Sequence, residues 1–202
     1  MISLIQTAEG ALNETHSILQ RMRELAVQGA NDTNTTEDRA AIKAEIEELN
    51  AEITRISDTT QFNKKELLNG SLSVTLQIGA NAGQDLNIAI TLALNATGLS
   101  IDSIAVDTAA SASAAIDSID TAIEKVSEVR SYLGANQNRL DHTINNLNTS
   151  SENLTAAESR VRDVDMAKEM MQQTKASILA QASQAMLAQA NQMPQGVLQL
   201  LR

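Results

Sequence analysis

Residues able to support acid–base, nucleophilic or metal chemistry are few and scattered along the chain. Cysteine is absent, and the two histidines, His16 and His142, fall on separate predicted helices. A catalytic triad needs a nucleophile, a base and an orienting group within hydrogen-bond reach, and no such set accompanies either histidine. Each histidine is expected to be a surface or packing residue.

One pair of carboxylates is spaced for acid–base or metal work. Asp163 and Asp165 lie close together, but Arg160, Arg162 and Lys168 flank them. Opposite charges in a polar segment favour a solvated cluster of ion pairs over a catalytic or metal-binding dyad. We therefore predict no catalytic, cofactor-binding or metal site, and no enzyme activity.

The charge and hydropathy of the chain exclude further classes of protein. The net charge is −10 and the isoelectric point is about 4.6, which disfavours nucleic acid as a partner because phosphate binding needs clustered Lys and Arg. No apolar run reaches the roughly 18 residues of a membrane span. The start, MISLIQTAEG, lacks a basic segment followed by a long apolar one, so a cleaved signal peptide is not expected.

The composition predicts a helical rather than a usual globular core. Aromatic residues are 1% of the chain, and Phe62 and Tyr132 are its only large rings. Burial must therefore come from Leu, Ile, Val, Met and Ala, which suit long helices packed side by side.

Apolar residues at helical spacing predict two helices in the first third of the chain. The first covers residues 2–30, and the turn-forming NDTNTT follows it. The second covers residues 36–57, with acidic residues in its first turn, and its apolar positions alternate steps of four and three: Ile42, Ile46, Leu49, Ile53 and Ile56. The same reasoning finds no full capping box from Thr36 to Arg39 at its start.

Residues 58–70 are predicted to be a loop that ends in the turn Asn69-Gly70. Alternation of apolar and polar residues on both sides of GANAGQD then predicts a β-hairpin over residues 71–94. We interpret the glycines of GANAGQD as part of the hairpin turn and not as a phosphate-binding loop. Residues 95–108 are predicted to be an irregular link.

The rest of the chain returns to the helical pattern. A stripe over residues 109–157 includes Leu133, Leu140, Ile144, Leu147 and Leu154, and is expected to be buried by the two N-terminal helices. Residues 1–157 carry 21 acidic and 10 basic residues, whereas residues 158–202 carry 4 and 5. We predict a mainly α fold: a rod-like long-helix bundle with a small β-hairpin over residues 1–157, and a C-terminal amphipathic helix over residues 158–202.

Several long segments, in order, carry a resemblance to a known family. They are ISLIQTAEGALNETHSILQRMRELAVQGANDTN, TQFNKKELLNG, LGANQNRLDHTINNLNTSSENLTAAESRVRDVDMAKEM and QASQAMLAQANQMPQGVLQLLR. Over essentially its whole length the chain resembles bacterial flagellin. The resemblance implies a rod domain at residues 1–157 and, at residues 158–202, a helix that coils with others in the inner tube of the flagellar filament.

Two departures from the family are expected. Flagellins carry a further N-terminal helical segment before the stretch that starts here at Ile2, and this segment is expected to be missing. The chain also passes almost directly from the hairpin to the long helix, so the variable outer domains of larger flagellins are expected to be absent.

The resemblance implies a structural subunit that self-assembles into the extracellular flagellum for motility. Its implied partners are other flagellin subunits, a flagellin export chaperone on the C-terminal helix and the host Toll-like receptor 5, with no nucleic acid and no membrane. An alternative is a binding module, recognised by Toll-like receptor 5 or by the chaperone.

The resemblance also implies two sets of site residues. Arg21, Leu25 and Glu45 match the receptor-binding positions, and Arg21, Leu25 and Gln28 are spaced to share one helix face. Apolar residues of the C-terminal helix are expected to contact neighbouring subunits or the chaperone: Ile178, Ala182, Ala185, Met186, Leu187, Met193, Val197, Leu198 and Leu201.

Overall fold

The structure, a computed structural model, describes the backbone of residues 1–163 and 165–200 and the side chains of residues 1–163 and 165–191. The chain divides into two units, Met1–Leu147 and Asn148–Arg202. Nowhere in the described residues is a helix both long enough and apolar enough to cross a membrane.

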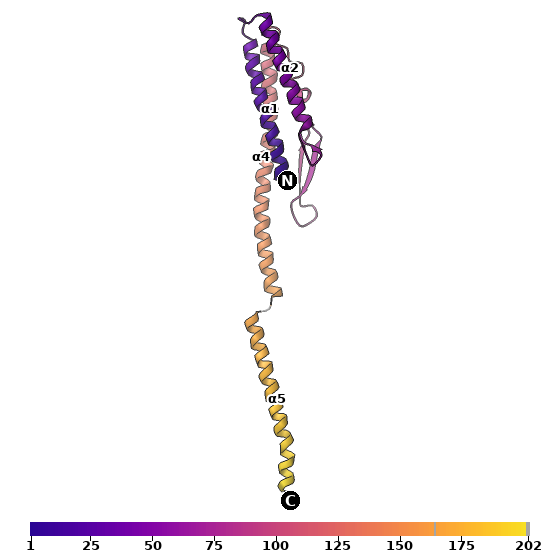
Figure 1. Cartoon of the computed structure of the whole chain (residues 1–202), viewed down its shortest axis with the longest axis vertical. Coiled ribbons are helices and arrows are strands. Elements are labelled where there is room, and N and C mark those ends of the chain that lie inside the picture. Colours follow the sequence, from indigo (N-terminus) through magenta and orange to yellow (C-terminus); the bar gives the residue numbers. More distant parts are fainter. Residues whose placement is uncertain (164, 201–202) are drawn as a thin grey trace. The chain divides into compact units, whose positions relative to one another are not determined.

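Three long helices form the first unit. They are α1 (Ile2–Gly29), α2 (Thr36–Thr59) and the first part of α4 (Ala109–Arg162), which lie side by side in Figure 1. Both neighbours of α1 run antiparallel to it, as Figure 1 shows, and Arg21 pairs with Glu45 of α2 and Arg23 with Asp120 of α4. The predicted mainly α fold is confirmed.

Small side chains let these helices approach closely. Ala8 and Ala26 of α1 and Ala112 and Ala122 of α4 are fully buried beside larger residues such as Leu12, Leu19, Met22, Ile46, Ile53 and Val126. A Cβ on Gly29 would lie 3.7 Å from the Cβ of Ala112 and 3.9 Å from Cγ2 of Ile42, so the three helices meet at this glycine. Alanines thus complete a core almost without aromatic rings.

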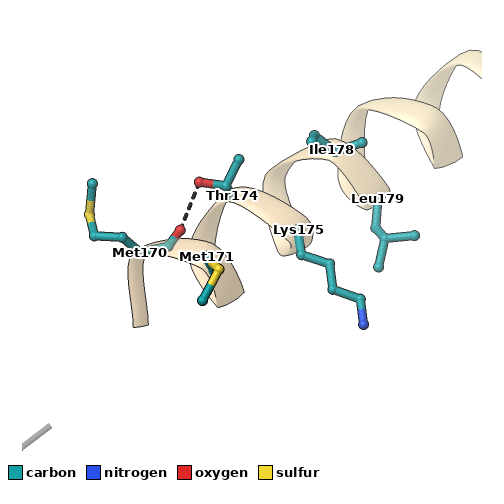
Figure 2. A pocket seen from close by; sticks show the side chains of 6 residues that line it. All are labelled: Met170, Met171, Thr174, Lys175, Ile178 and Leu179. Atoms are coloured by element: carbon teal, nitrogen blue, oxygen red, sulfur yellow. Dashed lines mark hydrogen bonds between the residues drawn. The ribbon is translucent and has the colours of Figure 1, made fainter. Parts of the chain in front are cut away.

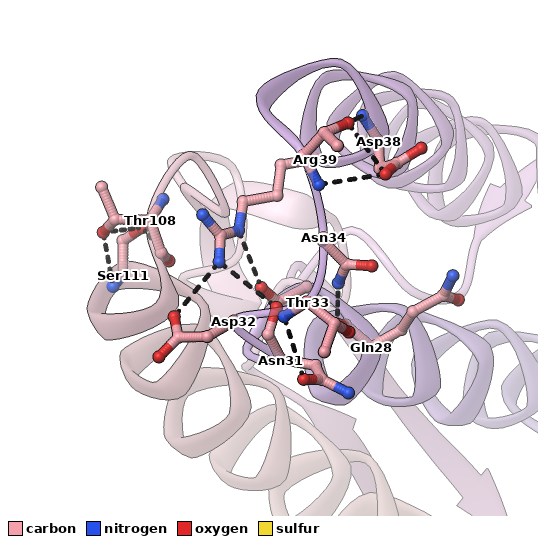
Figure 3. Close-up of polar contacts among 11 residues, drawn as sticks. Gln28, Asn31, Asp32, Thr33, Asn34, Asp38, Arg39, Thr108 and Ser111 are labelled. Atoms are coloured by element: carbon pink, nitrogen blue, oxygen red, sulfur yellow. Dashed lines mark hydrogen bonds and ion pairs between the residues drawn. The ribbon is translucent and has the colours of Figure 1, made fainter.

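The turn between α1 and α2 satisfies carbonyl groups that the end of α1 leaves free. Arg39 reaches back from α2, and its Nε and Nη2 donate to the carbonyls of Gly29 and Asn31, each at 3.2 Å (Figure 3). The amide of Asn34 donates to the carbonyl of Gln28. The last carbonyls of a helix have no partner inside it, so these contacts fix where α1 ends.

A capping box starts α2. Its N-cap is Thr35, one residue before the Thr36 considered from the sequence. The hydroxyl of Thr35 accepts from the Asp38 N–H at 3.3 Å, and the Asp38 carboxylate accepts from the Thr35 N–H at 3.0 Å. The sequence prediction considered only Thr36 with Arg39, which form no such box, and therefore missed Thr35 with Asp38. The N-cap is the last residue outside the helix.

The segment predicted to be a loop contains a small hairpin. β1 (Gln61–Phe62) pairs with β2 (Lys65–Glu66), and the turn residues Asn63 and Lys64 have φ angles of 51° and 64°. Two positive φ angles define the tight turn that matches strand twist. Two-residue strands are too short to show alternation, so the sequence pattern did not reveal them.

A longer hairpin packs on the helices. β3 (Leu72–Gln77) and β4 (Asp85–Ile90) are antiparallel, with Leu72 opposite Ile90 and Gln77 opposite Asp85. Leu72, Leu86, Ile88 and Ile90 are buried on one face. The following link contains α3 (Ala96–Leu99), a single turn in which Asn95 Oδ1 accepts from the Gly98 N–H at 2.8 Å.

The apolar stripe of α4 is buried along only part of its length. Leu133 and Leu140 are at most 2% exposed, whereas Ile144, Leu147 and Leu154 are 41–70% exposed. The expectation that the N-terminal helices bury the whole stripe is therefore wrong. Described by itself, the second unit contains residues 148–162 of α4 and the helix α5 (Met166–Leu200).

Candidate interaction surfaces

The residues weighed for chemistry form no reactive centre. His142 is exposed on α4, and the Nε2 atom of half-buried His16 lies 3.0 Å from the Gln20 amide. Among the residues that the structure describes, no group of three metal-ligating side chains comes together. The histidines are on separate helices without a shared site.

The carboxylates at the junction before α5 have structural partners. Asp163 Oδ2 accepts from the Ser159 hydroxyl at 2.6 Å. Asp165 Oδ1 accepts from the Ala167 N–H at 3.0 Å and from the Lys168 N–H, which is N-cap geometry. Asp165 therefore caps the first turn of α5, a role that the sequence analysis missed, although an Asp before a helical pattern is a recognised N-cap signal.

A charged face spans α1 and α2. Arg21 Nε and Nη2 both donate to Glu45 Oε1, at 3.0 and 2.9 Å, and Nη1 donates to Glu24 Oε2 at 3.3 Å. The hydrogen bond to Glu45 is the largest cause that raises the pKa of Arg21, so the guanidinium stays charged. The Arg21 and Glu45 side chains are 51% and 45% exposed, and Gln28 is also exposed. We call Arg21, Glu24, Gln28 and Glu45 the α1–α2 charged face.

Leu25 does not share this exposed face. Its side chain is 2% exposed and belongs to the core with Met22 and Ala26. The expectation of a common face from the i, i+4 spacing to Arg21 is not met. Residues on the border of a helix stripe can be covered by a neighbouring helix, which the spacing alone does not show.

The described side chains of α5, residues 166–191, are all exposed. They include large apolar groups: Met170, Met171, Ile178, Leu179, Met186 and Leu187. Figure 2 shows the first four flanking Thr174 and Lys175 along one stretch of helix, with the Thr174 hydroxyl donating to the Met170 carbonyl at 2.7 Å. We call these six residues the α5 apolar surface.

The predicted assembly residues map partly onto this surface. Ile178, Ala182, Ala185, Met186 and Leu187 are exposed on α5. The side chains of Met193, Val197 and Leu198, and the whole of Leu201, lie outside the described residues. Met170, Met171 and Leu179 belong to the surface but were absent from the predicted set, although the sequence offered the signal of apolar pairs in a segment of low charge.

A long-helix bundle, a small hairpin and a largely apolar exposed helix define a structural subunit built for assembly. Family models agree with this class: the bacterial flagellin N-terminal helical region matches residues 1–73, and the C-terminal helical region matches residues 116–201. The chain belongs to the bacterial flagellin family. It is a structural, non-enzymatic subunit of the extracellular flagellar filament, serves motility and polymerises with other flagellin subunits.

Relatives and solved structures agree with the family. A flagellin of Halalkalibacterium halodurans is 60% identical over 205 residues, which cover 100% of this chain and 75% of that protein. A flagellin of Bacillus subtilis is 51% identical, covering 100% of this chain and 77% of the relative. The crystal structure of Bacillus cereus flagellin superposes with a TM-score of 0.65 at 31% identity, over 77% of this chain and 90% of that one.

The comparison does not support the expectation of a missing N-terminal segment. The family model of the N-terminal helical region matches from residue 1 to residue 73, so this region is present. Within this region, Ile2–Gly29 form α1.

Proposed function

We propose that the α5 apolar surface is the part of this flagellin that neighbouring subunits cover in the filament. The observation that carries the proposal is the 57–72% exposure of its six large apolar side chains. Monomeric soluble proteins rarely expose large apolar areas without a partner. In this proposal residues 1–157 act as the rod domain and residues 158–202 as the inner-tube helix.

The distribution of the apolar groups supports several neighbours rather than one. They occur as adjacent pairs, Met170 with Met171, Ile178 with Leu179 and Met186 with Leu187. Adjacent residues point about 100° apart around a helix, so more than one side of α5 is apolar. A helix that is apolar on several sides is typical of a buried position. Repeated, non-closing contacts between copies would place α5 inside a filament.

Seeded elongation tests this assignment. Ile178→Glu places a charge on the α5 apolar surface, and Ser177→Glu places the same charge one residue away at a polar position. Purified chains are added to sheared filament seeds, and polymer is scored by sedimentation and electron microscopy. We expect Ile178→Glu to slow elongation at least about tenfold, because an unpaired buried charge is costly, and Ser177→Glu to have a much smaller effect. Equal elongation by both variants would exclude the α5 apolar surface from assembly.

We also propose that the same surface binds a flagellin export chaperone before assembly. A single helix gains most of its stability from packing, so a partner that covers α5 would order it and keep its apolar groups from water. Calorimetric titration of the full chain with the chaperone tests this. Ile178→Glu is expected to weaken binding and Ser177→Glu to preserve it, whereas equal affinity would place the chaperone elsewhere.

The α1–α2 charged face is the second candidate site, for which we propose recognition by Toll-like receptor 5. Arg21 with Glu45 is a solvent-exposed ion pair, and such pairs add little to stability, so its charged groups remain available to a partner. Arg is also a frequent binding hot spot. Gln28 lies on the same exposed side of α1, whereas Leu25 would act only by holding the helix in place.

Receptor binding with conservative variants tests this second site. Arg21→Gln removes the guanidinium, and Arg55→Gln removes the equivalent group from the exposed Arg55–Glu52 pair elsewhere on α2. We expect the first variant to weaken receptor binding about tenfold or more and the second to leave it unchanged. If both variants bind the receptor as strongly as the original chain, Arg21 is not part of the interface.

A further inference from the structure

The methionines of this chain are unevenly placed. There are seven, and the chain has no cysteine or tryptophan. Met22 is fully buried in the first unit, whereas Met166, Met170, Met171 and Met186 of α5 are 57–72% exposed. Met1 is exposed too, but it lies at the start of α1 in the other unit.

Exposed thioethers react with two-electron oxidants. Without cysteine, methionine sulfur is the most readily oxidised group in this chain. We propose that Met170, Met171 and Met186 are oxidation sites for peroxides in unassembled subunits, and that their sulfoxides prevent α5 from being covered by neighbouring subunits. This inference rests on the proposed assembly role of the α5 apolar surface.

The chemical step is balanced by the peroxide alone. The thioether sulfur gives an electron pair to one oxygen of hydrogen peroxide, the O–O bond breaks and an S–O bond forms. The second peroxide oxygen leaves as water after proton transfer. Sulfur is oxidised by two electrons and the peroxide is reduced by two, so no further reactant is needed.

The position of these residues makes the product disruptive. Met170 and Met171 lie about two turns before Ile178 and Leu179 in the stretch of Figure 2, and Met186 adjoins Leu187. Each sulfoxide replaces an apolar group by a polar one within the α5 apolar surface. Covering it without a hydrogen-bond partner has an unfavourable free energy, whereas an uncovered helix tolerates it in water.

The same geometry predicts protection after assembly. If neighbouring subunits cover α5, peroxide cannot reach the sulfurs of Met170, Met171 and Met186 in the filament. These positions should then oxidise readily in the monomer and at least about tenfold more slowly in the polymer. Met22, which is buried in the monomer, should resist oxidation in both states.

Partial oxidation of the full chain provides the test. Monomer is treated with hydrogen peroxide until about one methionine per chain is oxidised, and the peroxide is removed. Filament seeds are added, and pellet and supernatant are analysed by peptide mass spectrometry. We expect sulfoxide at Met170, Met171 or Met186 to be enriched about tenfold in the supernatant. Sulfoxide at exposed Met1 should divide evenly, which makes it an internal control.

A variant gives an independent measurement. Met→Leu at positions 170, 171 and 186 keeps apolar volume and helix propensity, and it should elongate seeds at the same rate before and after peroxide treatment. Equal distribution of the α5 sulfoxides between pellet and supernatant would overturn the inference, as would equal oxidation rates in monomer and filament. If Ile178→Glu without peroxide still assembles normally, the proposed function itself fails; if only the peroxide effect is missing, the assembly role stands and this inference falls.

Discussion

Replacing Leu25 by alanine separates core packing from surface recognition. The Leu25 side chain is 2% exposed within the unit Met1–Leu147. Truncating a buried leucine to alanine costs about 2–5 kcal/mol, through lost burial and a residual cavity. In a domain of this size each kcal/mol lowers the unfolding midpoint by roughly 2–4 °C. We therefore expect Leu25→Ala to unfold about 4–20 °C below the original chain.

Far-ultraviolet circular dichroism during heating measures this shift. Arg21→Ala is the matched comparison, four residues away on the same helix. Its guanidinium lies in solvent, so its unfolding midpoint should stay close to that of the original chain. If Leu25→Ala unfolds with an unchanged midpoint, the burial of Leu25 and the reasoning from it are refuted.

The comparison also changes how receptor experiments are interpreted. Loss of receptor binding by Leu25→Ala would mix a damaged helix bundle with any lost contact. Loss of binding by Arg21→Ala, at an unchanged unfolding midpoint, would report the surface alone. Variants of the α1–α2 charged face should therefore be chosen from Arg21, Gln28 and Glu45.

Two further predictions concern local backbone structure. Hydrogen bonds from the Thr35 N–H and hydroxyl lower the pKa of Asp38, so this carboxylate adds stability above its unfolded-state pKa, and that stability is lost as pH falls through the folded-state pKa. When the free energy of unfolding is measured against pH, Asp38→Asn should therefore lose less stability in acid than the original chain. Identical profiles for the two chains would contradict the capping box. Gly70→Ala should destabilise more than Gly83→Ala, because both glycines have φ of +82° but only at Gly70 would the new Cβ meet backbone, 2.7 Å from the Ala93 nitrogen. Equal urea midpoints for the two alanine variants would show that the contact at Gly70 is unimportant.

The long helices could be predicted because their signal is repeated over many turns. Residues such as Leu12, Leu19 and Ile46 recur at helical spacing, and the structure buries them as expected. The ends were less certain: α4 continues to Arg162, beyond the predicted residue 157. Polar side chains near a helix end can be solvated in either state, so the pattern does not define the last turn.

Features that depend on few residues were not predictable in the same way. The β1–β2 hairpin rests on two turn residues with positive φ, Asn63 and Lys64, and neither is glycine. The burial of Leu25 and the exposure of Ile144 depend on which helix lies opposite each position. Such information is tertiary, and periodicity along one helix does not contain it.

The candidate surfaces were predictable to different degrees. The change in charge balance at residue 158 and the apolar residues beyond it pointed to α5, whereas the family resemblance pointed to Arg21 and Glu45. The contact between Arg21 and Glu45 joins positions 24 residues apart and required the structure. It explains why these two side chains form one face.

Hydrogen exchange of α5 tests the central claim most directly. Amide exchange of residues 166–191 is compared between the monomer and the filament by mass spectrometry. A single exposed helix opens easily, whereas a packed one exchanges slowly. We predict little protection of α5 in the monomer and at least about a hundredfold slower exchange in the filament. Equal exchange of α5 in the two states, with polymer present, would contradict the claim that neighbouring subunits cover this helix.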